Sequence, residues 1–548
     1  MKPNDIPSYA FRGTGEQVQA IQFAYRRSPD QDAPQPVRHS VVIVGAGPVG
    51  LTLAIDLAQR GQSVLLVDND DRLSIGSRAL CFAKRTLEIW DRLGVGDPMV
   101  DKGVSWNVGK VFLRDEQVYQ FNLLPEDGHE RPAFINLQQY YCEAYLVERA
   151  LQLHNIDIRW KNSVTDAVPG EDGVRLTLNT PEGDYSVLAD WVVACDGARS
   201  PMRGHLGLES KGRIFRDRFL IADVKMTADF PTERWFWFDP PFHPNQSVLL
   251  HREPDNVWRI DFQLGWDADP EEEKKPEKII PRVQALLGKD TEFSLEWASV
   301  YTFSCLRMER FVHGRVVFAG DSAHGVSPFG ARGANSGVQD ADNLGWKLDW
   351  VLRGRAGVEL LQTYGPEREY AADENILNST LATDFITPKS EISRLFRDQV
   401  LALARDHEFA RRIVNSGRLS VPATLHGSPL NTPDTDLFAG RMLPGAPLTD
   451  APVEVEGQKT WLLRSLDPEF TLLVFGEVPA WAAGLPNVQT LGVGSDLHDT
   501  QGLLAQRLDA TPGTAYLLRP DQHVCARWRQ PSEAAVRAAL ARATCAPQ

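Results

Sequence analysis

Hydrophobic positions near the start of the chain follow two different periods. Residues 40–44 and 63–67 are short apolar runs with the β-branched character of buried strands, and residues 48–60 between them carry apolar side chains at helical spacing. This order predicts a compact strand–helix–strand unit. The polar residues 1–37 before it include closely spaced prolines and predict an extended arm.

The middle of the chain alternates between apolar and polar positions, with a helical interruption. Extended segments are expected at 102–124, a helix at 136–153, and strands at 163–189 and 191–195. Residues 212–303 are expected to form strands throughout and are unusually rich in aromatic side chains. This pattern predicts a mainly antiparallel sheet.

The last part of the chain combines helices with a second set of strands. A buried strand is expected at 315–319, a long helix at 335–352, and further helices to about residue 416. A linker at 419–447 precedes strand-like runs at 471–475, 488–493 and 514–518. These runs predict a separate C-terminal α/β domain.

Composition narrows the class of protein. The chain has 548 residues, 43% of them apolar and 24% charged, which is ordinary for a soluble globular protein of two or three domains. Its formal net charge of −15 leaves no basic field for phosphate backbones, so nucleic acid is not an expected partner. The N-terminus lacks the apolar core of a secretory signal, and no apolar run is long enough to span a bilayer. The six cysteines are scattered without a CxxC pair or a zinc-like cluster, so we expect reduced thiols, a cytoplasmic protein and no metal site.

A glycine motif joins the first predicted strand to the first helix. Gly45, Gly47 and Gly50 have the G-x-G-x-x-G spacing, and Pro48 stands at the start of the helix. Gly45 permits a tight turn, Gly47 lets the backbone approach a pyrophosphate, and Gly50 lets helix and sheet pack closely. Asp68 follows the second strand, where it can bind an adenosine ribose. A packed turn without a ligand is the alternative, but strand, helix and acid together favour dinucleotide binding, without separating FAD from NAD.

Two later segments distinguish FAD from NAD because they resemble segments of a known family. One is Asp196-Gly197-Ala198-Arg199-Ser200-Pro201-Met202-Arg203, and the other begins Gly320-Asp321-Ser322-Ala323-His324 and continues through Pro328, Gly333, Ala334 and Asn335. They resemble the D-G-x-x-S-x-x-R and G-D-A-x-H-x-x-x-P-x-x-G-x-G-x-N segments of the FAD-dependent aromatic hydroxylases typified by p-hydroxybenzoate hydroxylase. Residues 517–521 also resemble part of the thioredoxin-like appendage of the phenol and 3-(3-hydroxyphenyl)propionate hydroxylase branch.

The resemblance implies an α/β fold in which a Rossmann-like FAD-binding domain is interleaved with a mainly antiparallel-sheet substrate domain, followed by a thioredoxin-like α/β domain. The implied division is an N-terminal arm at 1–37, FAD-binding segments at 38–103, 125–211 and 304–380, substrate-domain sheet at 104–124 and 212–303, a helical segment and linker at 381–439, and the C-terminal domain at 440–548. Because the C-terminal domain lacks CxxC, an interaction or stabilising role, including homodimer formation, is favoured over thiol chemistry.

The resemblance also assigns cofactor contacts. Besides the glycine motif and Asp68, the residues implied at the FAD site are Arg78, Gln139, Asp196, Gly197, Gly320, Asp321, Gly333, Ala334 and Asn335. Asp321 stands at a strand end, where its carboxylate can accept hydrogen bonds from ribityl hydroxyls. The last three residues open a helix whose free N–H groups can face the flavin pyrimidine. For Arg78 and Gln139, a surface salt bridge and an exposed helix position are the respective alternatives.

One departure from the family pattern lies next to this helix. Many relatives have G-Q-G where this chain has Gly330-Ala331-Arg332-Gly333, so Arg332 adds a cation near the expected isoalloxazine edge. Arg332 is a candidate for binding an acidic substrate or the nicotinamide phosphates, and a salt bridge to a nearby carboxylate is the equal alternative. The resemblance places the Pro328 carbonyl over the flavin, near the substrate. Cys195 and His324 are expected to pack and to order the turn, respectively, rather than to react.

The implied reaction needs two dinucleotides, although only one glycine fingerprint is present. In the family the nicotinamide meets the flavin without a Rossmann domain of its own. The resemblance therefore implies an FAD-dependent monooxygenase in which NAD(P)H reduces the flavin, O2 forms a C4a-hydroperoxide, and its terminal oxygen is transferred to a small phenolic substrate. A hydroxylase or epoxidase of a non-aromatic or polyketide substrate, and a flavin-binding protein without turnover, are the alternatives.

The aromatic middle sheet is the expected wall of the substrate site. Trp237 and Phe262 are the aromatic candidates, and His251, Gln263 and Tyr301 are the polar candidates for a contact with the phenol. The alternative for each aromatic residue is an ordinary place in the core.

Overall fold

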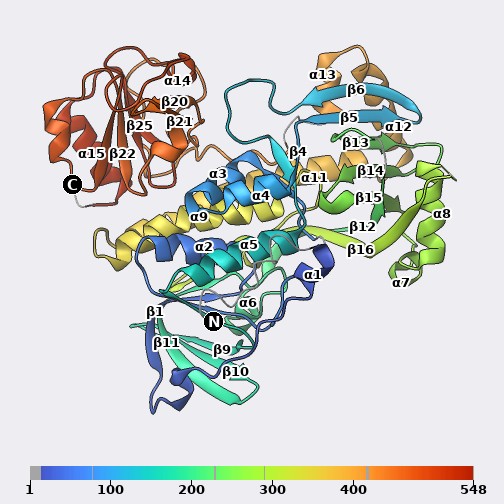
Figure 1. Cartoon of the computed structure of the whole chain (residues 1–548), viewed down its shortest axis with the longest axis horizontal. Coiled ribbons are helices and arrows are strands. Elements are labelled where there is room, and N and C mark those ends of the chain that lie inside the picture. The colour runs from blue at the N-terminus through green and yellow to red at the C-terminus, as the bar shows by residue number, and fades with distance from the viewer. Residues whose placement is uncertain (1–13, 77, 228–229, 289, 415–418, 547–548) are drawn as a thin grey trace.

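The computed structural model describes residues 14–76, 78–227, 230–288, 290–414 and 419–546 (Figure 1). Within these ranges, none of the helices combines the length and the apolar character that crossing a bilayer requires. The arm before the first strand contains α1 (Gly15–Gln19) and the short helical turn η2 (Pro29–Asp32). Asp30 in this turn lies 2.8 Å from both His39 and Arg159, which ties the arm to the first sheet.

The first sheet is mainly parallel and carries the glycine motif. Its strand order is β17-β18-β11-β1-β2-β8, and β10 and β9 extend it beside β11. Because β1 pairs in parallel with β2 and β11, the strand ends at Val44, Val67 and Ala194 lie side by side. The strands are β1 (Val37–Val44), β2 (Val64–Val67), β8 (Ile156–Arg159), β9 (Ser163–Pro169), β10 (Val174–Thr180), β11 (Gly183–Ala194), β17 (Val312–His313) and β18 (Val316–Phe318).

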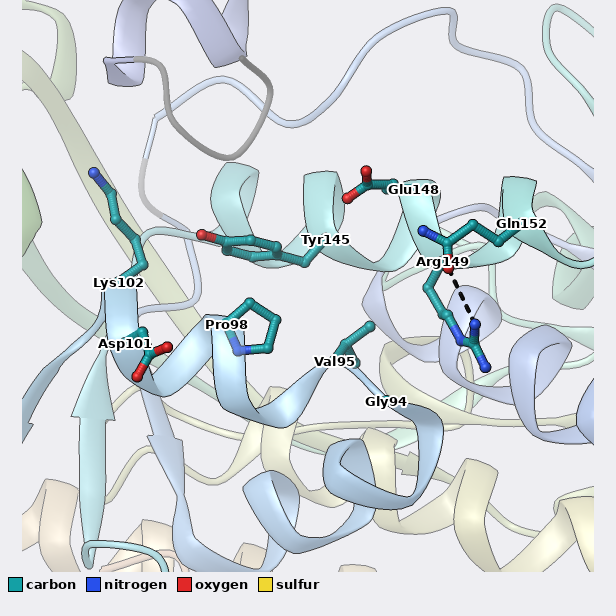
Figure 2. Close-up of a pocket in the computed structure, with 9 residues that line it drawn as sticks. All are labelled: Gly94, Val95, Pro98, Asp101, Lys102, Tyr145, Glu148, Arg149 and Gln152. Atoms are coloured by element: carbon teal, nitrogen blue, oxygen red, sulfur yellow. Dashed lines mark hydrogen bonds between the residues drawn. The ribbon is translucent and has the colours of Figure 1, made fainter. Parts of the chain in front are cut away.

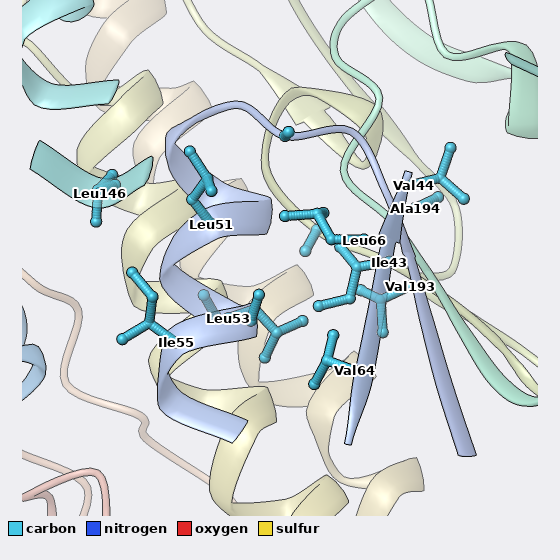
Figure 3. Packing of buried hydrophobic residues seen from close by; sticks show 14 of the residues in the cluster. Ile43, Val44, Leu51, Leu53, Ile55, Val64, Leu66, Leu146, Val193 and Ala194 are labelled. Atoms are coloured by element: carbon cyan, nitrogen blue, oxygen red, sulfur yellow. The ribbon is translucent and has the colours of Figure 1, made fainter. Parts of the chain in front are cut away.

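Helix α2 (Pro48–Gln59) covers this sheet, and its buried side chains pack against those of the strands to form a hydrophobic core. Figure 3 shows Ile43, Leu66 and Val193 of neighbouring strands beside Leu53 of α2, and all four side chains are fully buried. Burial of a side chain of this size stabilises the fold by about 1.5–3 kcal/mol. This packing holds the glycine turn at the carboxyl edge of the sheet.

The second large sheet is mainly antiparallel, with the order β19-β16-β12-β15-β14-β13-β5-β6. Its strands are β5 (Val108–Leu113), β6 (Glu116–Asn122), β12 (Ser210–Met226), β13 (Arg234–Phe238), β14 (Ser247–Arg252), β15 (Val257–Leu264), β16 (Phe293–Met308) and β19 (His324–Gly325). A small third sheet consists of β3 (Cys81–Ala83), β4 (Val104–Trp106) and β7 (Phe134–Asn136).

The prediction of strands throughout residues 212–303 is wrong for one stretch. Helices α7 (Pro270–Glu273) and α8 (Pro276–Leu287) interrupt the strands. Pro276 is favourable in the first turn of α8, and the buried residues Ile279 and Val283 stand four positions apart on one face. The apolar spacing of this segment is helical, and α8 covers the outer face of the sheet.

A group of helices follows the second sheet. They are α9 (Gly333–Leu352), α10 (Glu359–Gln362), α11 (Tyr364–Ile386), α12 (Glu391–Ala404) and α13 (Glu408–Val414). Earlier in the chain lie α3 (Lys84–Leu93), α4 (Gly96–Lys102), α5 (Gln139–Gln152) and α6 (Pro201–His205). Figure 1 shows α9, in yellow, crossing the middle of the molecule toward the C-terminal region, while α12 and α13 lie beside β5 and β6.

The C-terminal region forms its own four-stranded sheet, with the order β23-β22-β24-β25. β22 pairs in parallel with β23 and antiparallel with β24, and β24 pairs antiparallel with β25. The elements are β20 (Pro452–Val455), β21 (Gln458–Trp461), β22 (Phe470–Phe475), β23 (Val488–Val493), α14 (Leu503–Arg507), β24 (Ala515–Leu518), β25 (Val524–Trp528) and α15 (Glu533–Ala543). Phe470 packs edge-on against Trp346 and Trp350 of α9, so this region is in direct contact with that helix.

Candidate active site

Close backbone contacts shape the glycine turn after β1. Gly45 has a φ of +107°, and a Cβ there would lie 2.4 Å from the carbonyl oxygen of Cys195. A Cβ on Gly50 would lie 2.0 Å from the Gly45 oxygen, so both positions require glycine. At Gly47, beside the N-terminus of α2, a Cβ would meet no atom within 4 Å. Gly47 thus faces open space in which a phosphate group can approach the helix end.

Asp68 supports this turn from the end of β2. Its Oδ2 accepts a hydrogen bond from the Ala46 N–H (2.6 Å), and its Oδ1 accepts one from the Asp70 N–H (2.8 Å). Burial raises the pKa of the Asp68 carboxyl group, and the backbone hydrogen bonds oppose that rise. The carboxylate therefore orders the glycine turn in addition to any contact with a ribose.

Arg203 joins the segment 196–203, the second cofactor motif, to the third motif, which begins at Gly320. Asp196 Oδ2 accepts a hydrogen bond from the Met202 N–H (2.9 Å), while its buried Oδ1 has no partner among the described residues. Arg203 donates to the carbonyl of Ala198 (2.7 Å) and to that of Ser322 (2.8 Å). The two segments, far apart in the sequence, therefore form one surface.

His324 has a structural position within the third motif. Its Nε2 lies 2.7 Å from Asp340 Oδ2, and its ring stacks on Phe311. Asp340 also accepts hydrogen bonds from the Gly320 N–H (2.9 Å) and from Arg368 Nε (2.6 Å). The pKa of Asp340 is lowered because His324 and Arg368 outweigh its burial. This network holds the Gly320-Asp321 turn and supports the expectation that His324 orders it.

Asp321 lies at the entrance of α9. Its side chain is exposed, and it forms no hydrogen bond within the described part of the chain. Desolvation of its carboxyl group by the neighbouring protein nevertheless raises the pKa of that group. A Cβ added at Gly333, the first residue of α9, would lie 3.8 Å from Asp321 Oδ1. The free carboxylate and the helix N-terminus therefore border the same space.

Asn335 contributes to this site through its backbone rather than through its side chain. Its Oδ1 accepts hydrogen bonds from the Ala83 N–H (2.8 Å) and from Thr86 Oγ1 (2.7 Å), and its Nδ2 donates to the carbonyls of Cys81 (2.9 Å) and Ala331 (2.6 Å). The amide thus joins the start of α9 to β3. The first N–H groups of α9, including that of Ala334, have no partner within the helix and can bind a ligand.

Gln139 and Arg78 lie near each other at the start of α5. Gln139 Oε1 accepts a hydrogen bond from the Ala79 N–H (2.9 Å), and its Nε2 donates to Glu143 (2.7 Å), so Gln139 orders the segment that carries Arg78. Arg78 is exposed. Burial raises the pKa of Tyr301 on β16, and the nearby charges of Arg259 and Arg78 oppose that rise. Arg78 is therefore close enough to Tyr301 of the second sheet for its charge to act on that side chain.

A cavity of about 510 Å³ lies between the second sheet and helices α11 to α13. Its aromatic walls are Phe121, Phe236, Phe238, Phe329, Phe385 and Phe396. Phe329, Gly330 and Arg332 bring the turn that precedes α9 into the wall. The Pro328 carbonyl in this turn accepts a hydrogen bond from the Ala331 N–H (3.2 Å), and buried Arg332 donates to Asn375 of α11 (3.4 Å).

Strand alternation separates the predicted substrate residues into two groups. Trp237 and Phe262 are buried in a cluster with Ile279 and Val283 of α8, on the outer face of the sheet. The geometry therefore does not support these two residues as walls of the cavity. Successive side chains of a strand point to opposite faces, so Phe236 and Phe238 take the wall position.

The polar candidates stand on the inner face of the same sheet. Tyr301 faces the segment of Arg78, as described above, and buried Gln263 accepts a hydrogen bond from the Ser247 N–H (3.0 Å). His251 is buried with its Nε2 3.7 Å from Asp261 Oδ2. The sequence-based candidates omitted Arg234 and Phe329, which line the cavity. The alternation around Trp237 is the signal that could have indicated Arg234.

A second recess, of about 500 Å³, lies between α4 and α5 (Figure 2). Figure 2 shows Pro98 of α4 beside Tyr145 of α5, with charged side chains around the rim. Arg149 there donates to Gln152 (3.0 Å). No residue of the three motifs lines this recess, so it is separate from the cofactor motifs.

Cys195 is suited to packing. Burial raises the pKa of its thiol well above the ordinary value, and the charge of neighbouring Asp196 adds to the rise. A neutral thiol is a poor nucleophile. This finding supports the expectation that Cys195 does not react.

Comparison with known proteins identifies the class. A family model described as "FAD binding domain" matches residues 38–379. A 6-methylpretetramide 4-monooxygenase from Streptomyces rimosus is 31% identical over 527 residues, which cover 91% of this chain and 91% of that protein. A probable NADH-specific resorcinol 4-hydroxylase from Rhodococcus jostii (strain RHA1) is 29% identical over 515 residues, covering 90% of this chain and 93% of the relative.

A solved structure shares the fold. The flavin-dependent monooxygenase PieE, in complex with FAD and substrate, superposes with a TM-score of 0.81 at 22% identity, covering 94% of this chain and 100% of that one. The fold and the three motifs thus define a flavoprotein of the FAD-dependent monooxygenase class. The chain belongs to the FAD-binding-domain family of aromatic hydroxylase type, with FAD as its cofactor.

The residues present fit this cofactor. Gly47 and Gly197 each leave open space where a Cβ would stand, Asp196 Oδ1 is a buried acceptor without a partner among the described residues, and the Asp321 carboxylate is free of hydrogen bonds there. An elongated ligand with phosphates and hydroxyl groups matches this combination.

Proposed function

We propose that the chain is a monooxygenase that hydroxylates a phenolic substrate with FAD, NAD(P)H and O2. The observation that carries the proposal is the aromatic cavity, because its wall includes the turn leading into α9. A planar ring held there adjoins the expected flavin position. Relatives named resorcinol 4-hydroxylase and 3-(3-hydroxy-phenyl)propionate/3-hydroxycinnamic acid hydroxylase support a phenol as the substrate class, and the name of the former supports NADH as a reductant.

The residues that would hold FAD suit different parts of the cofactor. The glycine turn with Pro48 and the N-terminus of α2 suits the pyrophosphate, Asp68 suits the adenosine ribose, and Asp321 suits the ribityl hydroxyls. The N–H groups that open α9, at Gly333, Ala334 and Asn335, suit the pyrimidine edge. The remaining candidates for contacts with FAD are Arg78, Gln139, Asp196, Gly197 and Gly320. When bound, FAD supplies the hydride acceptance and oxygen activation that side chains lack.

The side chains of the cavity have the task of positioning the ring and excluding water. Phe238 and Phe329 are nearly fully buried, and the Arg397 guanidinium lies 5.5 Å from the centre of the Phe238 ring. Arg397 is ion-paired with Asp398 of the same helix, so its charge is neutralised beside the aromatic wall. A dry, apolar wall protects reactive intermediates from hydrolysis.

The domain organisation that we propose keeps the boundaries expected from the sequence, with the cytoplasm as the location. The strand order and directions of the C-terminal sheet support a thioredoxin-like domain, and the absence of a CxxC pair from the sequence supports a stabilising role for it. The single glycine fingerprint supports a nicotinamide that binds without its own Rossmann domain.

A fused-ring aromatic substrate is the second candidate. A cavity of about 510 Å³ exceeds the needs of a single ring and lies within the range of about 300–1,000 Å³ that drug-sized ligands occupy. The relative named 6-methylpretetramide 4-monooxygenase also supports this candidate.

Anaerobic stopped-flow reduction of the flavin tests both candidates. NADH and NADPH would be mixed with the holoenzyme alone and with resorcinol, 3-(3-hydroxyphenyl)propionate or 1,3-dihydroxynaphthalene. We expect one ring class to accelerate reduction at least about tenfold, and oxygenation with ¹⁸O2 to add one labelled oxygen to that ring. If no phenol stimulates reduction and no oxygen is consumed, the chain is a flavin-binding protein without this activity.

A further inference from the structure

Three polar side chains on the inner face of the second sheet contain buried atoms that have no hydrogen-bond partner among the described residues. These atoms are Nη1 of Arg234, Nδ1 of His251 and Oδ1 of Asp261. The residues stand on the adjacent strands β13, β14 and β15. Buried polar atoms are nearly always paired, so three such atoms in one place need partners that the described side chains do not supply.

The three side chains differ in how far they reach the open space. His251 is only 3% exposed and lies behind Asp261, with 3.7 Å between its Nε2 and Asp261 Oδ2. The Asp261 side chain is 18% exposed. Arg234 lines the aromatic cavity and stands on β13 one position beyond the Trp235–Leu250 pair, which places it next to His251. Arg234 therefore borders the cavity and Asp261 is partly exposed, whereas His251 is buried next to Asp261.

The cluster faces the cofactor side of the molecule. Burial raises the pKa of the Cys81 thiol on β3 to about 11, and the charges of Arg234 and Asp261 act on the same thiol. Ala83 of this strand is hydrogen-bonded to Asn335 at the start of α9. The cluster therefore lies across from the strand that adjoins the expected flavin site.

Charge defines what the cluster can bind. Burial, followed by the charge of Arg234, lowers the pKa of His251 to about 4, so its imidazole is neutral near pH 7 and adds no positive charge beside Asp261. Arg259 on β15 is already ion-paired with Asp223 (2.9 Å) and Glu253 (3.4 Å). One carboxylate acceptor and one guanidinium donor remain, and together they complement a hydroxyl group, which donates one hydrogen bond and accepts another.

We propose that Asp261 and Arg234 form the hydroxyl-recognition site for the aromatic substrate, with His251 as the residue that positions Asp261. The substrate hydroxyl donates to the Asp261 carboxylate and accepts from the Arg234 guanidinium. This inference rests on the proposed function and narrows its substrate to a ring whose hydroxyl group is not etherified. An ether leaves the carboxylate unpaired, and a site built to bind a hydroxyl rejects an analogue that lacks it.

Binding of hydroxyl and methyl-ether pairs to the holoenzyme tests the inference. The pairs are resorcinol with 1,3-dimethoxybenzene and 1,3-dihydroxynaphthalene with 1,3-dimethoxynaphthalene, and the readout is perturbation of the flavin absorbance spectrum without reductant. The wild-type protein should bind one hydroxyl compound at least about tenfold more tightly than its ether. Asp261→Ala and the similarly sized Asp261→Leu should reduce this ratio to within about twofold, with FAD still bound.

Further variants separate recognition from general damage. Glu296→Ala removes an exposed carboxylate from β16 of the same sheet and should keep the wild-type ratio. His251→Ala should lower the ratio, and His251→Gln, which restores a nitrogen donor near the position of Nε2, should recover it. An unchanged ratio in both Asp261 variants, with hydroxylation of the ring intact, overturns the inference and leaves the proposed function standing. If no pair binds and no product forms in the wild type, the proposed function fails, and the inference fails with it.

Discussion

Asp321 and Cys195 both belong to the cofactor motifs, but their surroundings differ. The Asp321 carboxylate is free of hydrogen bonds in the described part of the chain and borders the N-terminus of α9, whereas burial raises the pKa of the Cys195 thiol well above its ordinary value. We predict that Asp321→Ala weakens FAD binding at least about tenfold, or about 1.4 kcal/mol, because it removes an acceptor. Cys195→Ser should leave FAD affinity and turnover within about twofold. Fluorescence titration of the apoprotein with FAD measures both, and equal losses would show that Cys195 has a larger role.

The buried carboxyl group of Asp450 in the C-terminal region should make the stability of the protein depend on pH. Its Oδ1 accepts hydrogen bonds from the N–H groups of Ala451 (2.9 Å) and Leu463 (3.0 Å), and burial raises its pKa from 3.8 to about 7. Because the folded-state pKa lies above the unfolded value, the contribution of this group to stability is greatest below about pH 4 and is lost as the pH rises to about 7.

We therefore predict that Asp450→Asn raises the free energy of unfolding above pH 7, by up to about 4 kcal/mol at about 1.4 kcal/mol per pKa unit. The variant and the wild type should converge below about pH 4, where the Asp450 carboxyl group is protonated in both folded and unfolded chains. Urea unfolding between pH 3.5 and pH 8 measures the difference. A difference that does not change with pH would contradict the raised pKa.

At the scale of the element, β13 shows how one strand serves two purposes. Phe236 and Phe238 line the cavity, while Trp237 is buried against the α8 side of the sheet. We predict that Phe236→Ala leaves FAD bound and nicotinamide oxidation active but lowers hydroxylated product and raises hydrogen peroxide, because water gains access to the ring site. Trp237→Ala should instead destabilise the protein by about 3–5 kcal/mol.

The ratio of product to peroxide for each nicotinamide oxidised distinguishes these variants, and thermal unfolding measures stability. Folded Trp237→Ala should keep the wild-type ratio. If Trp237→Ala uncouples the reaction and Phe236→Ala does not, the outer face of the sheet holds the substrate and the proposed cavity is not the active one.

At the scale of the whole molecule, a buried charge network joins the C-terminal region to the flavin-binding part. Arg519 donates to Glu367 of α11 (2.6 Å) and is paired with Asp521, and Lys347 of α9 donates to the same glutamate (2.7 Å). All four side chains are at most 1% exposed. Because α9 begins at the expected flavin site and ends beside the C-terminal sheet, the two regions share one structural element.

We predict that Arg519→Gln lowers the free energy of unfolding by about 3–5 kcal/mol, since it removes the cation that Glu367 and Asp521 share and leaves only Lys347 paired with Glu367. FAD release should move to lower temperature together with unfolding, as followed by flavin fluorescence and circular dichroism. Arg537→Gln is the matched control, because its ion pair with Glu533 is half-exposed and contributes at most about 1 kcal/mol. Two separate transitions in Arg519→Gln would show that the C-terminal region unfolds on its own.

The sequence by itself determined a dinucleotide-binding turn and most of the elements near it, and the resemblance of two later segments to a known family specified FAD. Gly45, Gly47 and Gly50 act within one turn, Asp68 follows the adjacent strand, and the helix expected at 335–352 corresponds to α9 (Gly333–Leu352). These features depend on backbone conformation and on spacing along the chain, so they can be predicted without long-range contacts. The helix α8 was missed because a short apolar pattern inside an alternating region does not distinguish helix from strand.

Only the tertiary structure decided which side chains meet across the substrate site. Trp237 and Phe236 are adjacent aromatic residues that the sequence does not distinguish as wall residues. Because they stand on one strand, their side chains point to opposite faces of the sheet. Helix α8 packs on the face of Trp237, whereas Phe236 lines the cavity. Arg203 likewise joins two motifs more than a hundred residues apart, and Arg234, His251 and Asp261 come together through strand pairing. Contacts of this kind depend on register and on packing between distant segments, which local spacing does not encode.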